Sequence, residues 1–466
     1  MGGIYLERSV KLRDEKVSKL LLEFSIPAIV GMLVNALYIV IDRIFIGRVV
    51  GAMAISGVSL TFPISIIIMA FAMLVGIGAA ARISIKLGEN NKDEAEHILG
   101  NALVLLIIVS IIITIFGLIF VDPMLRAFGA SDNTVVYAKQ FITILICASI
   151  LQTVGFGLNN IIRSEGDPKT AMNTMLIGGI CNIILDFLFI YILHFGIRGA
   201  AVATSISQGI NMIWVLYYFL KGNSMLKIKK KYLRLNKDIV TSIFSIGMSP
   251  FAMQIAASLV NVILNKSLGI YGGDLAIGAM GIINGIATMI LMPIFGINQG
   301  SQPVIGFNYG AKLYRRVKKA LLLAIAAGTF VSAAGGLAVQ IFPTALVNMF
   351  NKSDMNLTNI TVNGIKIFMI MFPIVGFQIV SSNFFQAIGK AKISMFLALL
   401  RQVIVLIPML LILPRIFKLN GVWMAAPVSD GVSSILTGLF LFLEIKRLNA
   451  NGKENLSSSK ASECIK

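Results

Sequence analysis

Cysteine, histidine and acidic residues are scarce in this sequence. The 466 residues include three Cys and two His, and 21 Asp and Glu stand against 40 Lys and Arg. Cys147, Cys181 and Cys464 are too few and too scattered for a disulfide framework. A histidine-bound metal site is hard to build from His97 and His194 alone. Since a nucleophile–base constellation is also missing, we expect no enzyme and no resident cofactor.

Charge of either sign is sparse, and apolar residues dominate. Only 13% of the residues are charged, 57% are hydrophobic, and the mean hydropathy is +0.87. Apolar runs of about 20 to 28 residues recur along the chain, and each is long enough to cross about 30 Å of hydrocarbon. Short alternating strands of a membrane barrel do not occur. The sequence therefore predicts an all-α membrane protein.

Charged or Gly/Pro-rich breaks separate twelve apolar runs, which we interpret as twelve transmembrane helices. The predicted spans lie near 20–46, 53–84, 97–120, 134–162, 169–194, 197–220, 239–270, 275–306, 317–342, 357–388, 392–413 and 419–444.

The basic residues predict the orientation of these spans. If both termini are cytoplasmic, about three quarters of the 40 Lys and Arg fall on the cytoplasmic side, as the positive-inside rule requires. Topology and anionic lipid thus explain the net charge of +19 better than nucleic acid does. We expect a multi-pass protein of the cell membrane (inner or plasma membrane), with no signal peptide.

The predicted spans divide the chain into two six-helix halves. A charged cytoplasmic segment (1–19) precedes the N-terminal lobe (20–220), and a basic cytoplasmic linker (221–238) leads into the C-terminal lobe (239–446). The polar remainder (447–466) is predicted to be a disordered cytoplasmic tail.

An internal repeat relates the two halves. A shift of about 222 residues superimposes short matches across four helices and their turns. The matched pairs include Ala54-Ile55 with Ala276-Ile277, Gly78 with Gly300, and, at a slightly smaller shift, Phe24-Ser25-Ile26 with Phe244-Ser245-Ile246. Two pseudo-symmetric bundles of the same orientation imply a parallel repeat with a cleft between its halves, where substrate would bind. Since one chain holds both repeats, a monomer suffices.

Two small-residue features suggest how the helices pack or bend. The pairs Gly76/Gly78 and Gly296/Gly300 favour close helix approach. Pro27 is interpreted either as a bend within the first span or as a marker of its first turn.

Charged side chains within the predicted spans are costly in hydrocarbon and therefore indicate functional positions. Asp42 lies late in the first span, with Asn35 and Tyr38 on the same helical face. One reading makes it a component of an ion site. The alternative is an interface residue near Arg43 and Arg48.

A second carboxylate occupies the fifth span. Asp186 has Asn182 one turn before it, and Thr204 enters the sixth span to a similar depth. Carboxylate, amide and hydroxyl oxygens suit a hard cation such as Na⁺, whereas a desolvated carboxylate pair suits a proton. Both coupling ions stay open, and a structural hydrogen-bonding role for Asp186 is the alternative.

The C-terminal half has different intramembrane chemistry. Arg401 and Asp430 both come out near the midplane and are expected to pair, either as a structural brace or in a substrate or gating role. The repeat-equivalent positions of Asp186 and Thr204 hold apolar residues around Pro408-Met409 and Ala426. Ion coupling is therefore expected in the first half.

Three segments make the sequence resemble the multidrug and toxic compound extrusion (MATE) family. These are FSIPAIVGMLVNALYIVIDRIFIGRVVG (Phe24–Gly51), LNNIIRSEGDPK (Leu158–Lys169), and NIILDFLFIY followed by GIRGAAVATSIS (Asn182–Ser207). The resemblance implies secondary antiport of bulky organic, often cationic, compounds against Na⁺ or H⁺. It also implies that Asp42, Asn182, Asp186 and Thr204, and further Asn159, form the cation site of the N-terminal lobe. Flippases for lipid-linked oligosaccharide or peptidoglycan precursors share this build and are the alternative.

Overall fold

The structure is a computed structural model that describes residues 2–49, 52–128, 132–350 and 355–463. Among these residues the chain forms helices joined by short connections, and no strand occurs. The elements are α1 (Gly2–Asp14), α2 (Val17–Val49), α3 (Ala52–Gly88), α4 (Lys92–Ala127), α5 (Asp132–Cys147), α6 (Ser149–Ser164), α7 (Pro168–Asp186), η1 (Phe187–Ile192), α8 (Gly196–Leu220), η2 (Lys230–Tyr232), α9 (Lys237–Gly310), α10 (Tyr314–Ile341), α11 (Pro343–Asn348), α12 (Met355–Phe368), α13 (Phe372–Ala387), α14 (Ala391–Leu399), η3 (Leu400–Val405) and α15 (Leu406–Glu463).

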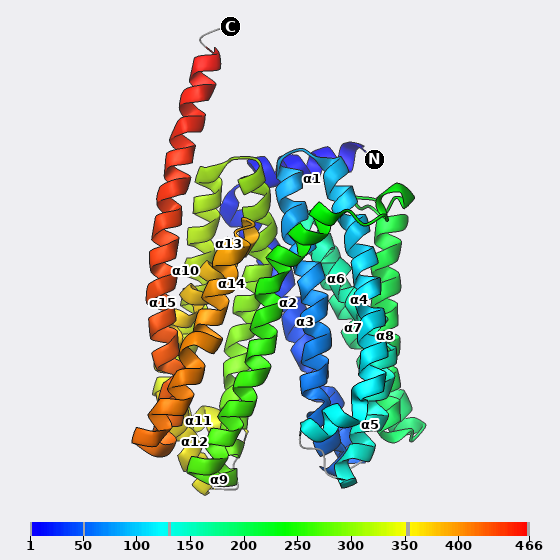
Figure 1. Ribbon diagram of the computed structural model, residues 1–466, viewed down its shortest axis with the longest axis vertical. Helices are drawn as coiled ribbons and strands as arrows, with labels where there is room; N and C mark the ends of the chain where they lie inside the picture. The colour runs from blue at the N-terminus through cyan, green and yellow to red at the C-terminus, as the bar shows by residue number, and fades with distance from the viewer. Residues whose placement is uncertain (1, 50–51, 129–131, 351–354, 464–466) are drawn as a thin grey trace. The chain divides into compact units, whose positions relative to one another are not determined.

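Two helical stretches are too long to be single membrane spans. The apolar stretches Lys237–Gly310 and Ala391–Ala450 have 74 and 60 residues, and 60 residues of helix would extend about 90 Å. Each contains one residue with non-helical dihedral angles, Gly273 and Lys418. Each is therefore two spans joined at a tight turn, and Figure 1 labels these stretches α9 and α14–α15.

Two further spans are bent helix pairs. The pair α5–α6 bends by 55° and the pair α12–α13 by 52°. With each long stretch counted twice and each bent pair once, the eight apolar helices become twelve spans in the described residues. The predicted all-α fold with twelve transmembrane helices is confirmed.

Backbone geometry repeats between the two halves. The bend at Ala148 and the bend at Ile370 are separated by the predicted shift of about 222 residues. Gly166 and Gly389 follow these helices with φ angles of +97° and +76°, values that favour glycine. At the first of these turns Asp167 accepts a hydrogen bond from the Thr170 amide and so caps α7.

The chain folds into two compact units whose boundaries differ from the predicted lobes. Unit 1 consists of Met1–Asp14 and Val30–Gln254, and unit 2 of Glu15–Ile29 and Ile255–Lys466. The division therefore falls inside α2 and α9 instead of at the linker 221–238. Pro27 lies ten residues inside α2, so the reading that it marks the first turn is wrong.

Within each unit, small residues allow neighbouring helices to approach closely. Unit 1 packs α3 against α4, α5 and α6, and α7 against α8; unit 2 packs α10 against α13. Figure 1 shows α3 and α4 side by side. A methyl group built on Gly247 at the start of α9 would lie 1.7 Å from the Leu74 carbonyl oxygen. One built on Gly300 would lie 2.6 Å from the Ser25 amide nitrogen. The close-packing interpretation of the glycines is confirmed.

The predicted linker is pinned to unit 1. The Asn101 side-chain amide donates to the carbonyls of Tyr232 and Arg234 at 3.1 Å each, and its oxygen accepts from the Asn236 amide at 2.7 Å. Lys229 also forms an ion pair with buried Glu96. These contacts satisfy backbone groups that have no helical partner.

The N-terminal helix docks on unit 1 through a buried carboxylate that follows α6. Arg8 of α1 lies 3.4 Å from Glu165 and 2.7 Å from Asp167. Glu165 also accepts hydrogen bonds from Tyr218, from Ser224 at 2.7 Å and from the Leu226 amide at 3.2 Å. Burial nevertheless raises the pKa of Glu165 to about 7.

The C-terminal segment continues as a helix. α15 extends to Glu463, through most of the segment 447–466 for which disorder was predicted. Alanine, lysine and glutamate, which favour helix, accompany its serines. Residues 464–466 lie outside the described residues.

A comparison of two glycines of α9 tests the close contact with α3. Gly247→Ala forces a methyl group against the Leu74 carbonyl, and we expect it to destabilise the protein by about 1–3 kcal/mol. Gly281→Ala meets nothing within 4 Å, and alanine's higher helix propensity should leave stability equal or improved. Thermal unfolding of the detergent-solubilised variants measures both. Equal midpoints for the two variants would contradict the packing argument.

The raised pKa of Glu165 predicts a pH dependence. Its ordinary pKa is 4.5 and its pKa in the fold is about 7. Between these values the folded state binds more protons than the unfolded chain, so the free energy of unfolding falls as pH rises. Glu165→Gln should remove this fall. Thermal unfolding from pH 5 to pH 8 compares the two proteins, with Asp132→Asn as a control at a carboxylate that is 88% exposed. Parallel profiles for wild type and Glu165→Gln would refute the assignment.

Candidate functional site

A polar face of α2 approaches α7 in unit 1. Asn35, Tyr38 and Asp42 follow one another at helical spacing on this face. The absence of a side chain on Gly179 of α7 makes room for α2, since a methyl group there would lie 2.9 Å from Val34 and 3.8 Å from the Tyr38 ring. Glycine at this point lets the α2 carboxylate approach α7 closely.

Asn182, Asp186 and Thr204 meet where α7 packs on α8. The Asn182 side-chain amide donates to the Thr204 hydroxyl at 3.4 Å. Asp186 is fully buried and Asn182 is 2% exposed. Both carboxylate oxygens of Asp186 and the amide oxygen of Asn182 lack a hydrogen-bond partner among the described residues. Three buried acceptor oxygens are thus left for a proton or a cation.

Electrostatics connect the α2 and α7 groups. Asp42 lies close enough to Asp186 for repulsion between the two carboxylates, and the Tyr38 hydroxyl interacts with both of them. The structure thus brings together Tyr38, Asp42, Asn182, Asp186 and Thr204. Their carboxylate, amide and hydroxyl oxygens are the donors that hard cations prefer, so the set fits Na⁺ as well as H⁺. A cluster of three or more His, Cys, Asp or Glu does not occur in the described residues.

Asn159 lies apart from this cluster. Its amide donates to the Ala171 carbonyl at 2.9 Å, and its oxygen accepts from Arg163 at 3.3 Å. Ala171 precedes Asn182 by eleven residues, or about 16 Å along α7. Asn159 therefore joins α6 to α7, away from the two carboxylates. Asn35 stands on the α2 face about 10 Å before Asp42.

A π-helical turn follows Asp186 directly. Residues Phe187–Ile192 form η1, and the Leu193 amide bonds to the Leu188 carbonyl five residues back at 2.9 Å. Such turns are rare and often occur at functional sites. Sequence reasoning missed this turn, because no residue type marks a π-turn within an apolar run.

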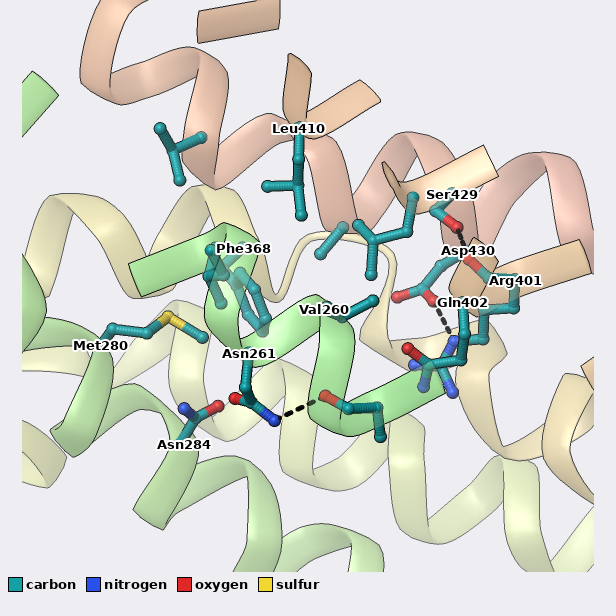
Figure 2. A pocket seen from close by; sticks show the side chains of 15 residues that line it. Val260, Asn261, Met280, Asn284, Phe368, Arg401, Gln402, Leu410, Ser429 and Asp430 are labelled. Atoms are coloured by element: carbon teal, nitrogen blue, oxygen red, sulfur yellow. Dashed lines mark hydrogen bonds and ion pairs between the residues drawn. The ribbon is translucent and has the colours of Figure 1, made fainter. Parts of the chain in front are cut away.

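Unit 2 contains the predicted ion pair. The Arg401 Nε atom donates to Asp430 Oδ1 at 2.7 Å, and the Ser429 hydroxyl donates to the Arg401 carbonyl at 2.6 Å. Arg401 lies in the π-turn η3 (Leu400–Val405). Figure 2 shows the pair on the wall of a cavity of about 180 Å³ whose lining also includes Asn261, Met280 and Phe368.

The comparisons with known proteins agree with this architecture. The family model MatE matches residues 27–188 and 250–412. Multidrug export protein MepA of Staphylococcus haemolyticus strain JCSC1435 is 26% identical over 96% of this chain and 98% of its own. MepA of Staphylococcus aureus strain MSSA476 is 27% identical, with 94% and 96% covered. The two MatE segments also begin at positions consistent with the internal repeat.

Solved structures show the same fold. A MOP superfamily transporter from Pyrococcus furiosus matches with a TM-score of 0.89 at 26% identity, covering 95% of this chain and 98% of that one. The MATE multidrug transporter DinF-BH, solved with a bound drug, matches with a TM-score of 0.87 at 39% identity, covering 92% and 96%. The resemblance drawn from the sequence is confirmed, and the chain belongs to the MATE family of multidrug efflux transporters.

Proposed function

We propose that this protein is a secondary active antiporter that exports bulky organic, often cationic, compounds in exchange for Na⁺ or H⁺. The observation that carries the proposal is the buried carboxylate of Asp186, whose two oxygens have no hydrogen-bond partner among the described residues. An ionised carboxylate in such a site is costly unless a cation or proton neutralises it. Binding and release of that ion supply the coupling.

The neighbouring groups support a coupling role. Asp42 adds a second carboxylate, and the charge on each favours cation uptake by the other. The Asn182 bond to Thr204 fixes the amide so that its oxygen remains available. A bound Na⁺ would take Asp42, Asn182, Asp186 and Thr204 as ligands, whereas a bound proton would need only the carboxylates.

The relatives support the substrate class. Both MepA proteins are named for multidrug export, and DinF-BH was solved with a drug bound. For this chain we infer export of organic compounds of comparable kind, with no enzymatic step and no cofactor besides the coupling ion. The basic residues support cytoplasmic termini in the cell membrane, and a single chain supplies both repeats, so we propose a monomer.

Removal of either carboxylate tests the coupling role. Asp42→Asn and Asp186→Asn should each reduce gradient-driven efflux of a fluorescent organic cation at least tenfold, because an amide cannot exchange the coupling ion. Everted vesicles with an imposed Na⁺ or H⁺ gradient measure the efflux. Asp274→Asn, at an exposed position of α9, is the matched control and should transport normally.

Three results would overturn parts of this proposal. Wild-type efflux that ignores both gradients excludes antiport and favours the flippase alternative, which movement of a lipid-linked precursor would then test. Full efflux by Asp42→Asn or Asp186→Asn removes that residue from the coupling role. Dependence on one gradient alone identifies the ion.

A further inference from the structure

The cavity of unit 2 is enclosed by elements from one lobe. The two legs of α9 contribute Asn261 and Met280, α12 contributes Phe368, and η3 and α15 contribute Arg401 and Asp430. Figure 2 shows the ion pair on one side of the space and Met280 and Phe368 on the other, with Asn261 and Asn284 pointing toward each other. The cavity thus combines a charged wall with an apolar and aromatic wall.

The internal repeat relates this cavity to the carboxylate cluster of unit 1. A shift of about 222 residues carries Tyr38 to Val260, Asp42 to Leu264 and Thr204 to Ala426, all of which line the cavity. The same shift carries Gly179 to Arg401. Where unit 1 presents oxygen ligands, unit 2 therefore presents apolar side chains and one ion pair. The equivalent place in the fold is lined for an organic ligand.

The ion pair leaves binding capacity unused. Arg401 donates to Asp430 through Nε alone, so its two Nη groups form no hydrogen bond with a described residue. The Oδ2 atom of Asp430 likewise accepts none from the described part of the chain. The Arg401 side chain is 23% exposed and that of Asp430 8% exposed, so the guanidinium is the more open of the two. A guanidinium edge of this kind binds a carboxylate by paired hydrogen bonds.

The charge of the pair restricts what can bind. A lone organic cation would face Arg401, and a lone organic anion would face Asp430, whereas the pair itself is neutral. A ligand with adjacent carboxylate and ammonium groups satisfies both free edges and keeps the site neutral. The apolar wall formed by Met280, Phe368 and Leu410 suits an aromatic ring.

We propose that the unit 2 cavity is a binding subsite for amphoteric aromatic compounds, whose carboxylate is bound by Arg401 and whose ammonium is bound by Asp430. The subsite deepens the proposed export function, on which it rests for its physiological meaning. A cavity of about 180 Å³ is smaller than the roughly 300–1,000 Å³ of a whole drug site. It therefore accommodates the charged aromatic end of a larger molecule.

Phenylalanine and two of its derivatives test the charge requirement. Phenylalanine carries both groups, its methyl ester carries only the ammonium, and N-acetylphenylalanine carries only the carboxylate. Titration of each compound into protein in lipid nanodiscs, followed by saturation-transfer NMR, gives apparent Kd values without any ion gradient. We expect phenylalanine to bind at least tenfold more tightly than either derivative, since each lacks one charged hydrogen-bond partner. Equal binding of the three compounds would overturn the proposal.

Paired substitutions locate the binding. The double variant Arg401→Gln/Asp430→Asn removes both charges together and leaves no single buried charge. It should weaken phenylalanine binding at least tenfold and abolish the preference over the ester. The matched control Lys390→Gln/Glu444→Gln neutralises another buried pair of the same unit, at 2.5 Å, and should bind phenylalanine normally. Unchanged binding by the first double variant would overturn the assignment.

A second variant covers the case in which that double variant does not fold. Arg401→Lys keeps the charge and the ion pair but loses the planar fork, so phenylalanine should bind several-fold more weakly while the ester is unaffected. Unaltered phenylalanine binding would refute the role of the guanidinium. Because binding is measured without a gradient, loss of organic-cation efflux with intact phenylalanine binding counts only against the proposed function. Loss of the charge preference with intact efflux counts only against the subsite.

Discussion

A buried carboxylate without a hydrogen-bond partner in the described chain is the constraint around which unit 1 is organised. Hydrocarbon provides no water to solvate an ion, so an ionised Asp186 depends on what the protein brings to it. Asp42 brings more negative charge, and Asn182 leaves a further acceptor oxygen unpaired among the described residues. The cluster therefore stabilises a positive ion or a proton, and its own ionised state is costly while empty. This imbalance gives an ion gradient a means of acting on the protein.

The surrounding helices hold the cluster through backbone proximity more than through polar bonds. Gly179 allows α2 to approach α7, and Gly178 lies against the Asn211 side chain of α8. The Asn182–Thr204 hydrogen bond links the cluster to α8. Close packing of small residues is a general means of helix association in lipid, where apolar burial gives little advantage. The Asp186 oxygens can then await an ion without loosening the bundle.

The two units solve one packing problem with different chemistry. Repeat-equivalent positions pair Asp42 with Leu264 and Gly179 with Arg401. A glycine that admits a neighbouring helix in unit 1 is thus an arginine in unit 2, where its side chain reaches Asp430 at 2.7 Å and leaves a cavity beside it. The inverted polarity extends to the turns after α6 and α13. Glu165 and Asp167 of the first turn bind Arg8, whereas Lys390 of the second binds Glu444.

The sequence predicted what hydrocarbon thickness dictates and missed what local backbone geometry adds. Run lengths were sufficient for twelve spans, and helical spacing brought Asp186 and Asn182 to one face. The bend at Ala148, the π-turns after Asp186 and around Arg401, and the Arg8–Glu165 contact were not predictable. A π-turn costs one hydrogen-bond register and changes no residue type, and a contact across 157 residues depends on tertiary packing.

The exchange of helix ends between the units was missed for a related reason. Hydropathy divides a chain at its polar linker, yet compactness depends on which backbones touch. Gly247 meets Leu74 in unit 1, and Gly300 meets Ser25 in unit 2, so each unit takes up the first part of a helix that continues in the other. Pro27 and Pro250 lie within five residues of these divisions. Since proline removes a helical hydrogen bond, both exchanging helices are weakest close to where they pass between units.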